Sequence, residues 1–258
     1  MRSLRIGLAI SAAGALVGLA SVAGAAPASA ATQSYQATLA PLNHSSASGT
    51  LMLTLDGNQA TITEQASGLA STFNNAPYPH VQHIHINGQG ACPTTAADTN
   101  GDGVISTTEG APAYGPIGTT LSTSGPTAAS AGTVLNIAPS GATVNYQRTI
   151  TLDSATVSAI QADKAVIVVH GLDPSTLSTK AQGEKSDLVP SLPLAATSPA
   201  LCGVLTVAQT SVMPTAGVQT GAGGTAGLQD PALFVLGGVL ALGGLTMFGV
   251  RRFALARH

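Results

Sequence analysis

The chain has 258 residues, a formal net charge of −2, two cysteines and only 8% charged residues. This weak, slightly negative charge excludes the basic surface that nucleic-acid binding requires, so we expect no nucleic-acid partner. No Gly-x-Ser-x-Gly motif or comparable pairing of a nucleophile with a base occurs, which argues against a hydrolase.

The two ends of the chain resemble a secretory signal and a membrane anchor. Arg2 and Arg5 precede an apolar run that leads into APASA, which predicts a signal peptide over residues 1–30. The uncharged run from Pro231 to Val250 is long enough to span a bilayer, and the arginine-rich tail 251–258 predicts a cytoplasmic end. The alternatives are an uncleaved N-terminal membrane helix and, at the other end, a buried core helix.

This order places residues 31–208 outside the cell as one domain, anchored at the cell surface through the plasma membrane. Residues 209–230 are rich in glycine and poor in apolar bulk, which predicts a flexible linker. Within it, MPTAG (Met213 to Gly217) resembles the LPxTG wall-sorting signal of Gram-positive bacteria. Ala216 replaces the threonine of that signal, so cell-wall attachment stands as a hypothesis beside plain membrane anchoring.

The domain between the two ends is predicted to be all-β. Apolar residues alternate in SYQATLAPL and in GTLMLTLDGNQATITEQASGL, and the second segment indicates a hairpin that turns at Asp56-Gly57-Asn58. VQHIHI, VNYQRTITL, the β-branched run KAVIVVHGL and GVLTVAQ are further predicted strands, and no long segment shows helical periodicity. Short strands with turn-rich connections predict an antiparallel sandwich or barrel.

The two cysteines are Cys92 and Cys202. Outside the cell they would meet oxidising conditions, in which a disulfide is expected. Two free, buried thiols are the alternative.

Three of the six histidines lie in the stretch PHVQHIHING. Because side chains alternate along a strand, His83 and His85 point to the same side, and two neutral imidazoles on one face suit copper or zinc. His80 has the opposite parity and would need a bend to join them. Surface histidines that bind nothing are the alternative. His44 and His258 are isolated, and we assign them no function.

The order of these segments resembles copper/zinc superoxide dismutase over approximately residues 34–208. ASGL followed by PHVQHIHING is similar to the family's histidine-bearing strand, which implies that His83 and His85 bind copper. VIVVHGLD resembles the family's V-V-H segment and makes His170 the third copper ligand. PALCGVLTVAQ resembles its A-C-G-V-I strand, which makes Cys202 the disulfide partner of Cys92. The implied fold is a Greek-key β-barrel.

The chain departs from this family at the zinc site. No histidine occurs from Gly90 to Val169, so a zinc site of the family's type is absent and copper would lose its bridging ligand. Pro199 also stands where the family has an arginine that guides the anionic substrate. We therefore expect copper binding without efficient dismutation. A copper-only redox enzyme with reduced dismutase activity is the alternative.

A second resemblance leads to a different expectation. Chordin-type (CHRD) domains carry a comparable H-I-H strand within an all-β extracellular module. That resemblance implies a structural or interaction module and no established chemistry.

The strongest local motif is DTNGDGVISTTE, which matches the calcium-loop pattern D-x-[DN]-x-[DN]-G-x5-E throughout. The expected ligands are the side chains of Asp98, Asn100 and Asp102, the carbonyl of Val104, Ser106 through water, and the bidentate carboxylate of Glu109.

The segments that flank this loop predict a structural calcium site and not a sensor. They contain no pair of amphipathic helices, and Pro112 and Pro116 argue against a helix that leaves the loop. We expect calcium to stiffen a long loop beside Cys92. An acidic, glycine-rich turn without metal is the alternative.

Overall fold

The computed structural model describes residues 32–209. The expected signal peptide, membrane helix and tail lie outside these residues, as does the expected linker apart from Gln209. Among the described residues, no helix is both long and apolar enough to cross a membrane.

The described part of the chain is mostly β-structure with short helices. The strands are β1 (Gln33–Pro41), β2 (Ser48–Asp56), β3 (Gln59–Ser67), β4 (Thr72–Phe73), β5 (Ala76–Pro77), β6 (Gln82–His85), β7 (Ile117–Thr120), β8 (Thr143–Thr151), β9 (Val166–His170), β10 (Pro199–Val204) and β11 (Thr206–Val207). The α-helices are α1 (Thr107–Tyr114), α2 (Ser154–Gln161), α3 (Thr179–Gly183) and α4 (Leu194–Thr197), and four 3-10 turns are η1 (Thr95–Ala97), η2 (Ala129–Ala131), η3 (Leu135–Ile137) and η4 (Pro174–Thr176).

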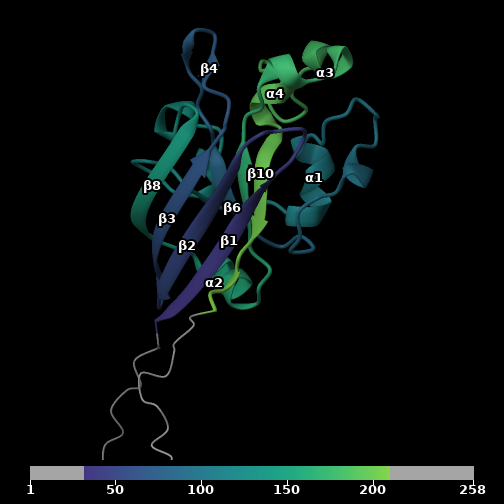
Figure 1. The fold of residues 1–258 in the computed structure, drawn as a ribbon. Helices are drawn as coiled ribbons and strands as arrows, with labels where there is room; N and C mark the ends of the chain where they lie inside the picture. Colours follow the sequence, from purple (N-terminus) through teal and green to yellow (C-terminus); the bar gives the residue numbers. More distant parts are fainter. Residues whose placement is uncertain (1–31, 210–258) are drawn as a thin grey trace, which may run out of the picture. The chain divides into compact units, whose positions relative to one another are not determined.

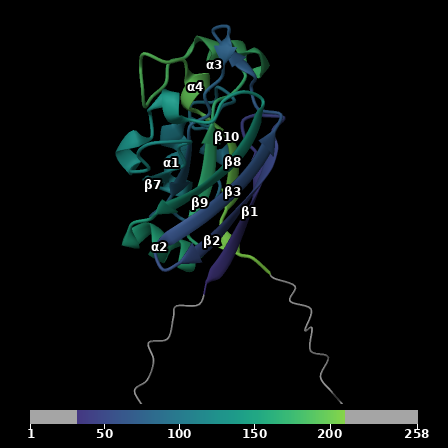
Figure 2. The ribbon, with the colours of Figure 1, turned by 90° about the vertical axis from the view of Figure 1, so that its left-hand side faces the viewer.

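Nine strands form one antiparallel sheet that curls into a half-barrel (Figures 1 and 2). The strand order is β7-β6-β9-β10-β1-β2-β3-β8, with β11 also paired to β1. The long strands β1, β2, β3 and β8 run side by side across one half of the sheet, and the shorter strands β10, β9, β6 and β7 complete the other half. This arrangement confirms the all-β prediction.

The alternation seen in the sequence sets the inner face of the sheet. Along β2, Leu51, Leu53 and Leu55 are buried while the residues between them are exposed. The β2–β3 hairpin turns where the sequence predicted it, and Gly57 has the positive φ of 59° that such a tight turn needs. Because each long strand contributes one buried side chain in every two residues, the concave side of the sheet fills with a single apolar core.

Polar contacts connect the two end strands of the sheet across the open side of the half-barrel. Arg148 on β8 donates hydrogen bonds to the carbonyl and hydroxyl oxygens of Ser122, just after β7, and to the carbonyl oxygen of Gly125. A single guanidinium group therefore joins β8 to the segment that follows β7, at the opposite end of the sheet order.

The outer face of β9 and β10 carries a second, smaller core. Val166, Val168 and Cys202 pack there against Tyr114 of α1. The expected disulfide between Cys92 and Cys202 is present and spans 110 residues of sequence. It ties the loop that precedes α1 to a central strand. This outer layer, next to α1 in Figure 1, is where the candidate site lies.

The helix α1 corrects one expectation from the sequence. Pro112 was expected to prevent a helix after the DTNGDGVISTTE loop, yet it lies inside α1. The helix forms because Ser106 and Glu109 make a reciprocal capping box at its start. In a helix of eight residues, Pro112 removes only one hydrogen bond, the one to the carbonyl of Thr108. The short helix α2, which begins at the capping residue Asp153, also went unpredicted.

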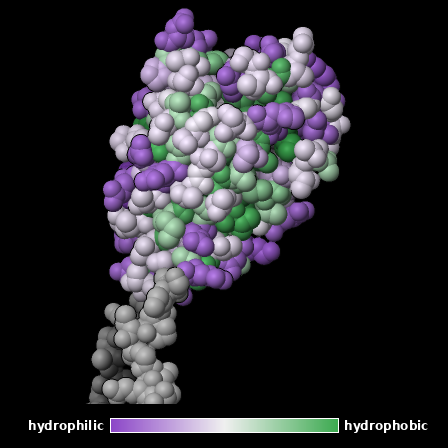
Figure 3. All heavy atoms as spheres, viewed as in Figure 1, coloured by the Kyte–Doolittle hydropathy of each residue, from purple (hydrophilic) through white to green (hydrophobic). Residues whose placement is uncertain are grey.

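The surface mixes polar and apolar residues. In the view of Figure 3, hydrophilic residues lie mostly at the periphery, and neutral or hydrophobic residues show between them. This pattern agrees with a chain in which only 8% of residues are charged.

Candidate metal centre

Two adjacent strands bring three histidines together on the outer face of the sheet. His83 and His85 alternate with Gln82 and Ile84 along β6, and His170 ends β9. The register pairs His83 with Val168, so His170 lies diagonally next to His83 on the same face. The sequence predicted the shared face of His83 and His85. Sheet pairing then adds the third ring.

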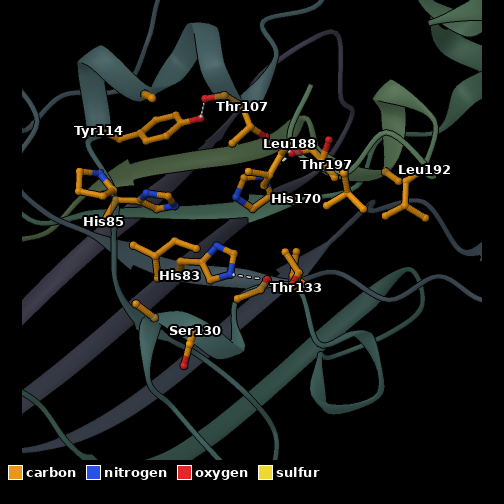
Figure 4. Close-up of a pocket in the computed structure, with 18 of the residues that line it drawn as sticks. His83, His85, Thr107, Tyr114, Ser130, Thr133, His170, Leu188, Leu192 and Thr197 are labelled. Carbon is orange, nitrogen blue, oxygen red and sulfur yellow. Dashed lines mark hydrogen bonds between the residues drawn. The ribbon is translucent and has the colours of Figure 1, made fainter. Parts of the chain in front are cut away.

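The three side chains form a compact, buried group (Figure 4). One ring nitrogen from each lies within 4.8 Å of the others. The ring centroids of His83 and His170 are 5.2 Å apart, and those of His83 and His85 are 5.4 Å apart. Each residue is no more than 3% exposed. Among the described residues, no other set of three His, Cys, Asp or Glu side chains brings its ligand atoms together in this way.

Each ring uses one nitrogen to bind a backbone carbonyl. The Nε2 of His83 lies 3.0 Å from the oxygen of Gly132, and the Nδ1 of His85 lies 2.7 Å from that of Gly115. The Nδ1 of His170 lies 2.6 Å from the oxygen of Thr197. A carbonyl only accepts hydrogen bonds, so in the neutral rings these three nitrogens carry the hydrogen.

The remaining three nitrogens therefore carry free lone pairs. The Nδ1 of His83 and the Nε2 atoms of His85 and His170 are buried and have no hydrogen-bond partner. Carbonyl contacts of this kind fix the tautomer and orientation of metal-binding histidines. The donor set thus fits a transition metal that prefers imidazole, because each ring presents a lone pair and none presents a competing N–H group.

Burial also keeps these rings neutral. Desolvation lowers the pKa of His85 to about 3 and that of His170 to about 4. It lowers the pKa of His83 well below the usual range, and the neighbouring His170 and His85 add to this effect. At neutral pH all three rings are in the form that binds metal, so binding does not require the loss of a proton.

Two of the carbonyl acceptors belong to glycines at which a side chain would not fit. Gly115 ends α1 with a φ of +86°, and a Cβ there would overlap the carbonyl oxygen of Ile86. A Cβ on Gly132 would lie 2.5 Å from a methyl of Ile117 and 3.1 Å from the Nε2 of His83. The sequence analysis did not identify either residue. For Gly115 a signal was available in the sequence, because a Gly-Pro pair such as Gly115-Pro116 marks a turn.

His80 remains outside the group, in agreement with its strand parity. Its Nδ1 contacts the carbonyl of His170 and its Nε2 contacts the carbonyl of Ala70, both at 2.9 Å. Both ring nitrogens are therefore occupied by backbone groups. His80 contacts the end of β9 that carries His170, and both of its ring nitrogens face backbone carbonyls and not the other three rings.

The acidic loop Asp98–Glu109 folds on itself and leads directly into α1. An oxygen of Glu109 accepts hydrogen bonds from the backbone N–H and hydroxyl of Thr99, and the other oxygen accepts from the backbone of Ser106. Asp98 accepts from the backbone N–H groups of Gly101 and Gly103. The side chain of Glu109, at position 12 of the loop, thus contacts Thr99 at position 2 and closes the loop. The carboxylates of Asp98 and Glu109 accept hydrogen bonds from backbone N–H groups.

The other expected ligands of this loop are held in different ways. Asn100 and Asp102 hydrogen-bond to each other through their side chains. The side chain of Val104 is buried in the main core, and the hydroxyl of Ser106 donates to Asp187. The structure therefore brings these residues into one loop, but it does not gather their carboxylates as tightly as it gathers the three imidazoles.

Comparison with known proteins adds no family to this description. No protein-family model matches the chain, and no curated protein matches it.

Proposed function

We propose that residues 31–208 form an extracellular domain that binds copper through His83, His85 and His170. The observation that carries this proposal is the set of three buried lone pairs that face one another without partners. An unpartnered buried acceptor costs about 1–3 kcal/mol. Three of them in one place are explained if a metal ion binds there.

Copper is the metal that this donor set favours. Imidazole nitrogens suit both copper and zinc, and the affinity of divalent first-row metals peaks at copper. When bound, copper would supply redox or Lewis-acid chemistry at this site. The resemblance to copper/zinc superoxide dismutase supports the same assignment, together with a Greek-key β-barrel topology of that type.

Binding without efficient superoxide turnover is the role that the surroundings favour. No Lys or Arg is among the described residues that line the cavity above the rings. A superoxide anion would therefore enter without the electrostatic attraction that speeds such encounters. A copper-only redox enzyme with low dismutase activity is the second candidate. A CHRD-type structural module is the third, and it leaves the three lone pairs unexplained.

The copper proposal predicts that removing one ring abolishes tight binding. We expect His170→Ala to weaken copper binding by roughly 100-fold or more, since even the outer partners of metal-binding histidines are worth 10–100-fold. Calorimetry and metal analysis of the purified full chain measure this change. Copper retention by His170→Ala equal to that of the parent would contradict the proposal.

The exposed residue His44 provides the matched control. His44→Ala removes an imidazole of the same chemistry without touching the cluster, so it should retain copper like the parent. Superoxide consumption by the copper-loaded parent, lost in His170→Ala, would favour the enzyme over the binding module.

We also propose that the loop Asp98–Glu109 binds calcium as a structural site outside the cell. The support is its ligand order and its closed shape, in which the twelfth residue already reaches the second. Calcium must displace N–H groups from the carboxylates, so we expect affinity in the millimolar range typical of extracellular modules.

Glu109→Gln should remove calcium binding, because position 12 supplies the bidentate carboxylate. Calorimetry should show heat of binding for the parent and none for this variant. Asp56→Asn, which neutralises an exposed carboxylate at the β2–β3 turn, should bind like the parent. Equal binding by the parent and Glu109→Gln would contradict the calcium proposal.

The anchor and the location at the cell surface are proposals that rest on the sequence alone. The disulfide between Cys92 and Cys202 is compatible with export, since such bonds persist in oxidising environments. Fractionation of cells that express the full chain, with and without residues 231–258, would locate it.

A further inference from the structure

The three histidines form the floor of a cavity of about 610 Å³. This volume is in the range of pockets that take small organic molecules, which is roughly 300–1,000 Å³. It is far more than a metal ion and a diatomic ligand need. The size of the cavity therefore raises the question of what else it holds.

The walls of the cavity are predominantly apolar and carry no charged side chain. The aliphatic residues that line it include Val81, Ile117, Leu135, Leu188, Val189 and Leu192. Among the described lining residues there is no Lys, Arg, Asp or Glu. An ion that entered would lose its hydration without gaining a counter-charge, which is costly. The walls thus favour a neutral ligand with a hydrocarbon body.

Two hydroxyl groups near the rings, those of Tyr114 and Thr107, are already engaged. The Tyr114 hydroxyl donates to the carbonyl of Thr107 at 2.8 Å, and the Thr107 hydroxyl donates to the carbonyl of Thr197 at 2.6 Å. Tyr114 also packs against His85, with ring centroids 4.6 Å apart. Tyr114 therefore provides an aromatic surface beside the floor, and the hydroxyl protons of Tyr114 and Thr107 are already donated to backbone carbonyls.

At the floor of the cavity, the free ring nitrogens lack a hydrogen-bond donor. The free nitrogens of His83, His85 and His170 accept hydrogen bonds or bind metal, and they have no partner. A ligand that carries one hydroxyl group could donate to one of these nitrogens in the metal-free protein. The same oxygen could approach a metal held by the three rings.

We propose that this cavity binds a neutral phenol-type molecule, with its ring against the apolar walls and its hydroxyl group toward the three histidines. This ligand class deepens the proposed function and rests on it for the role of the metal. The cavity and its walls exist without metal, so binding of the phenol is testable separately from binding of copper.

Three probes of similar size separate the contributions of the aromatic ring, the hydroxyl group and a negative charge to binding. We expect p-cresol to bind the full chain with sub-millimolar affinity, and toluene, which lacks the hydroxyl group, to bind several-fold more weakly. In the metal-free protein, the anion 4-methylbenzoate should bind at least about tenfold more weakly than p-cresol, because no lining residue carries a charge that compensates its own. Calorimetry on the metal-free and the copper-loaded protein gives all three affinities.

A matched pair of surface variants locates the site. Leu188 lines the cavity and is 51% exposed, while Met52 on β2 is 46% exposed and lies outside it. Leu188→Asp should weaken p-cresol binding at least about fivefold by placing a charge at the wall, and Met52→Asp should leave it unchanged. Both residues are largely exposed, so both variants should fold.

Several outcomes would overturn the proposal. These are no binding of p-cresol in either metal state, binding of 4-methylbenzoate to the metal-free protein more tightly than p-cresol, or equal effects of Leu188→Asp and Met52→Asp. A dimer that forms through the cavity mouth and is lost in Leu188→Asp would also overturn it, because a second copy would then be the occupant. Binding of p-cresol without binding of copper would leave the ligand class standing and remove the copper proposal.

Discussion

Glu64→Gln should stabilise the domain by about 2–5 kcal/mol at pH 8 and change little at pH 4.5. Glu64 faces the inner core from β3, is 1% exposed, and both of its carboxylate oxygens lack a hydrogen-bond partner. Two polar side chains, Tyr146 and Gln82, lie near this carboxylate. It pairs across the strands with Tyr146, whose hydroxyl is also unpartnered, and Gln82 lies close enough to assist the charged form.

The pH dependence follows from the position of this carboxyl group. Desolvation raises the pKa of Glu64 to about 8, although the Gln82 side chain opposes this rise. The unfolded chain loses the proton near its ordinary pKa of 4.5, whereas the folded chain keeps it until about 8. Between these values the unfolded state binds fewer protons, so the stability of the parent falls as the pH rises. Glutamine has the same shape and no proton to lose.

Urea unfolding of the parent and the variant at pH 4.5 and pH 8 measures the difference directly. The buried histidines act in the opposite direction, because their lowered pKa values make stability rise with pH up to about 6.5. Comparison with the parent cancels that contribution. Asp56→Asn, an exposed carboxylate, should show no such gain. An equal gain at both pH values would show that ionisation of Glu64 is not its cause.

Removal of the disulfide should lower the free energy of unfolding by about 4–5 kcal/mol in the chain-entropy model. Cys92 and Cys202 are separated by 110 residues, and so long a loop leaves the unfolded chain much freer when the bond is absent. The bond also holds the segment before α1 against β10. That segment continues to Gly115, whose carbonyl orients His85.

The double variant Cys92→Ala, Cys202→Ala tests this expectation by urea unfolding. Reductant should destabilise the parent to the level of the double variant and should have no effect on the variant itself, which separates the bond from other effects of the reductant. A loss below about 1 kcal/mol would show that residual structure in the unfolded chain already supplies most of the constraint.

Local patterns predicted most of the sheet. Alternating side chains identified the residues of β1, β2, β3 and β8, and the Asp56-Gly57-Asn58 signal located the hairpin. The very short strands β4, β5 and β7 were missed because too few residues alternate in them. The helix α1 was missed because Pro112 was read as a helix breaker and the capping box of Ser106 and Glu109 was not considered. In the structure this box stabilises the start of the short helix.

Of the candidate site, too, only the part that depends on local pattern was predicted from the sequence. Strand parity alone placed His83 and His85 on one face and left His80 on the other. The place of His170 came from a resemblance to a family, and the pairing of β6 with β9 puts its ring beside the other two. No local signal identified the carbonyl acceptors of Gly132 and Thr197, because each lies at the end of a short helical turn or helix far from its histidine in the sequence.

By itself, the sequence determined which residues form the long strands, which faces those strands bury, and that two histidines share one face. These properties depend on the order of neighbouring side chains, which a single chain carries in full. Only the tertiary structure decided that a third ring, three backbone carbonyls and an apolar wall surround the same point. Such properties arise when distant segments pack together, and the free lone pairs of the three rings exist because that packing fixes where each hydrogen lies.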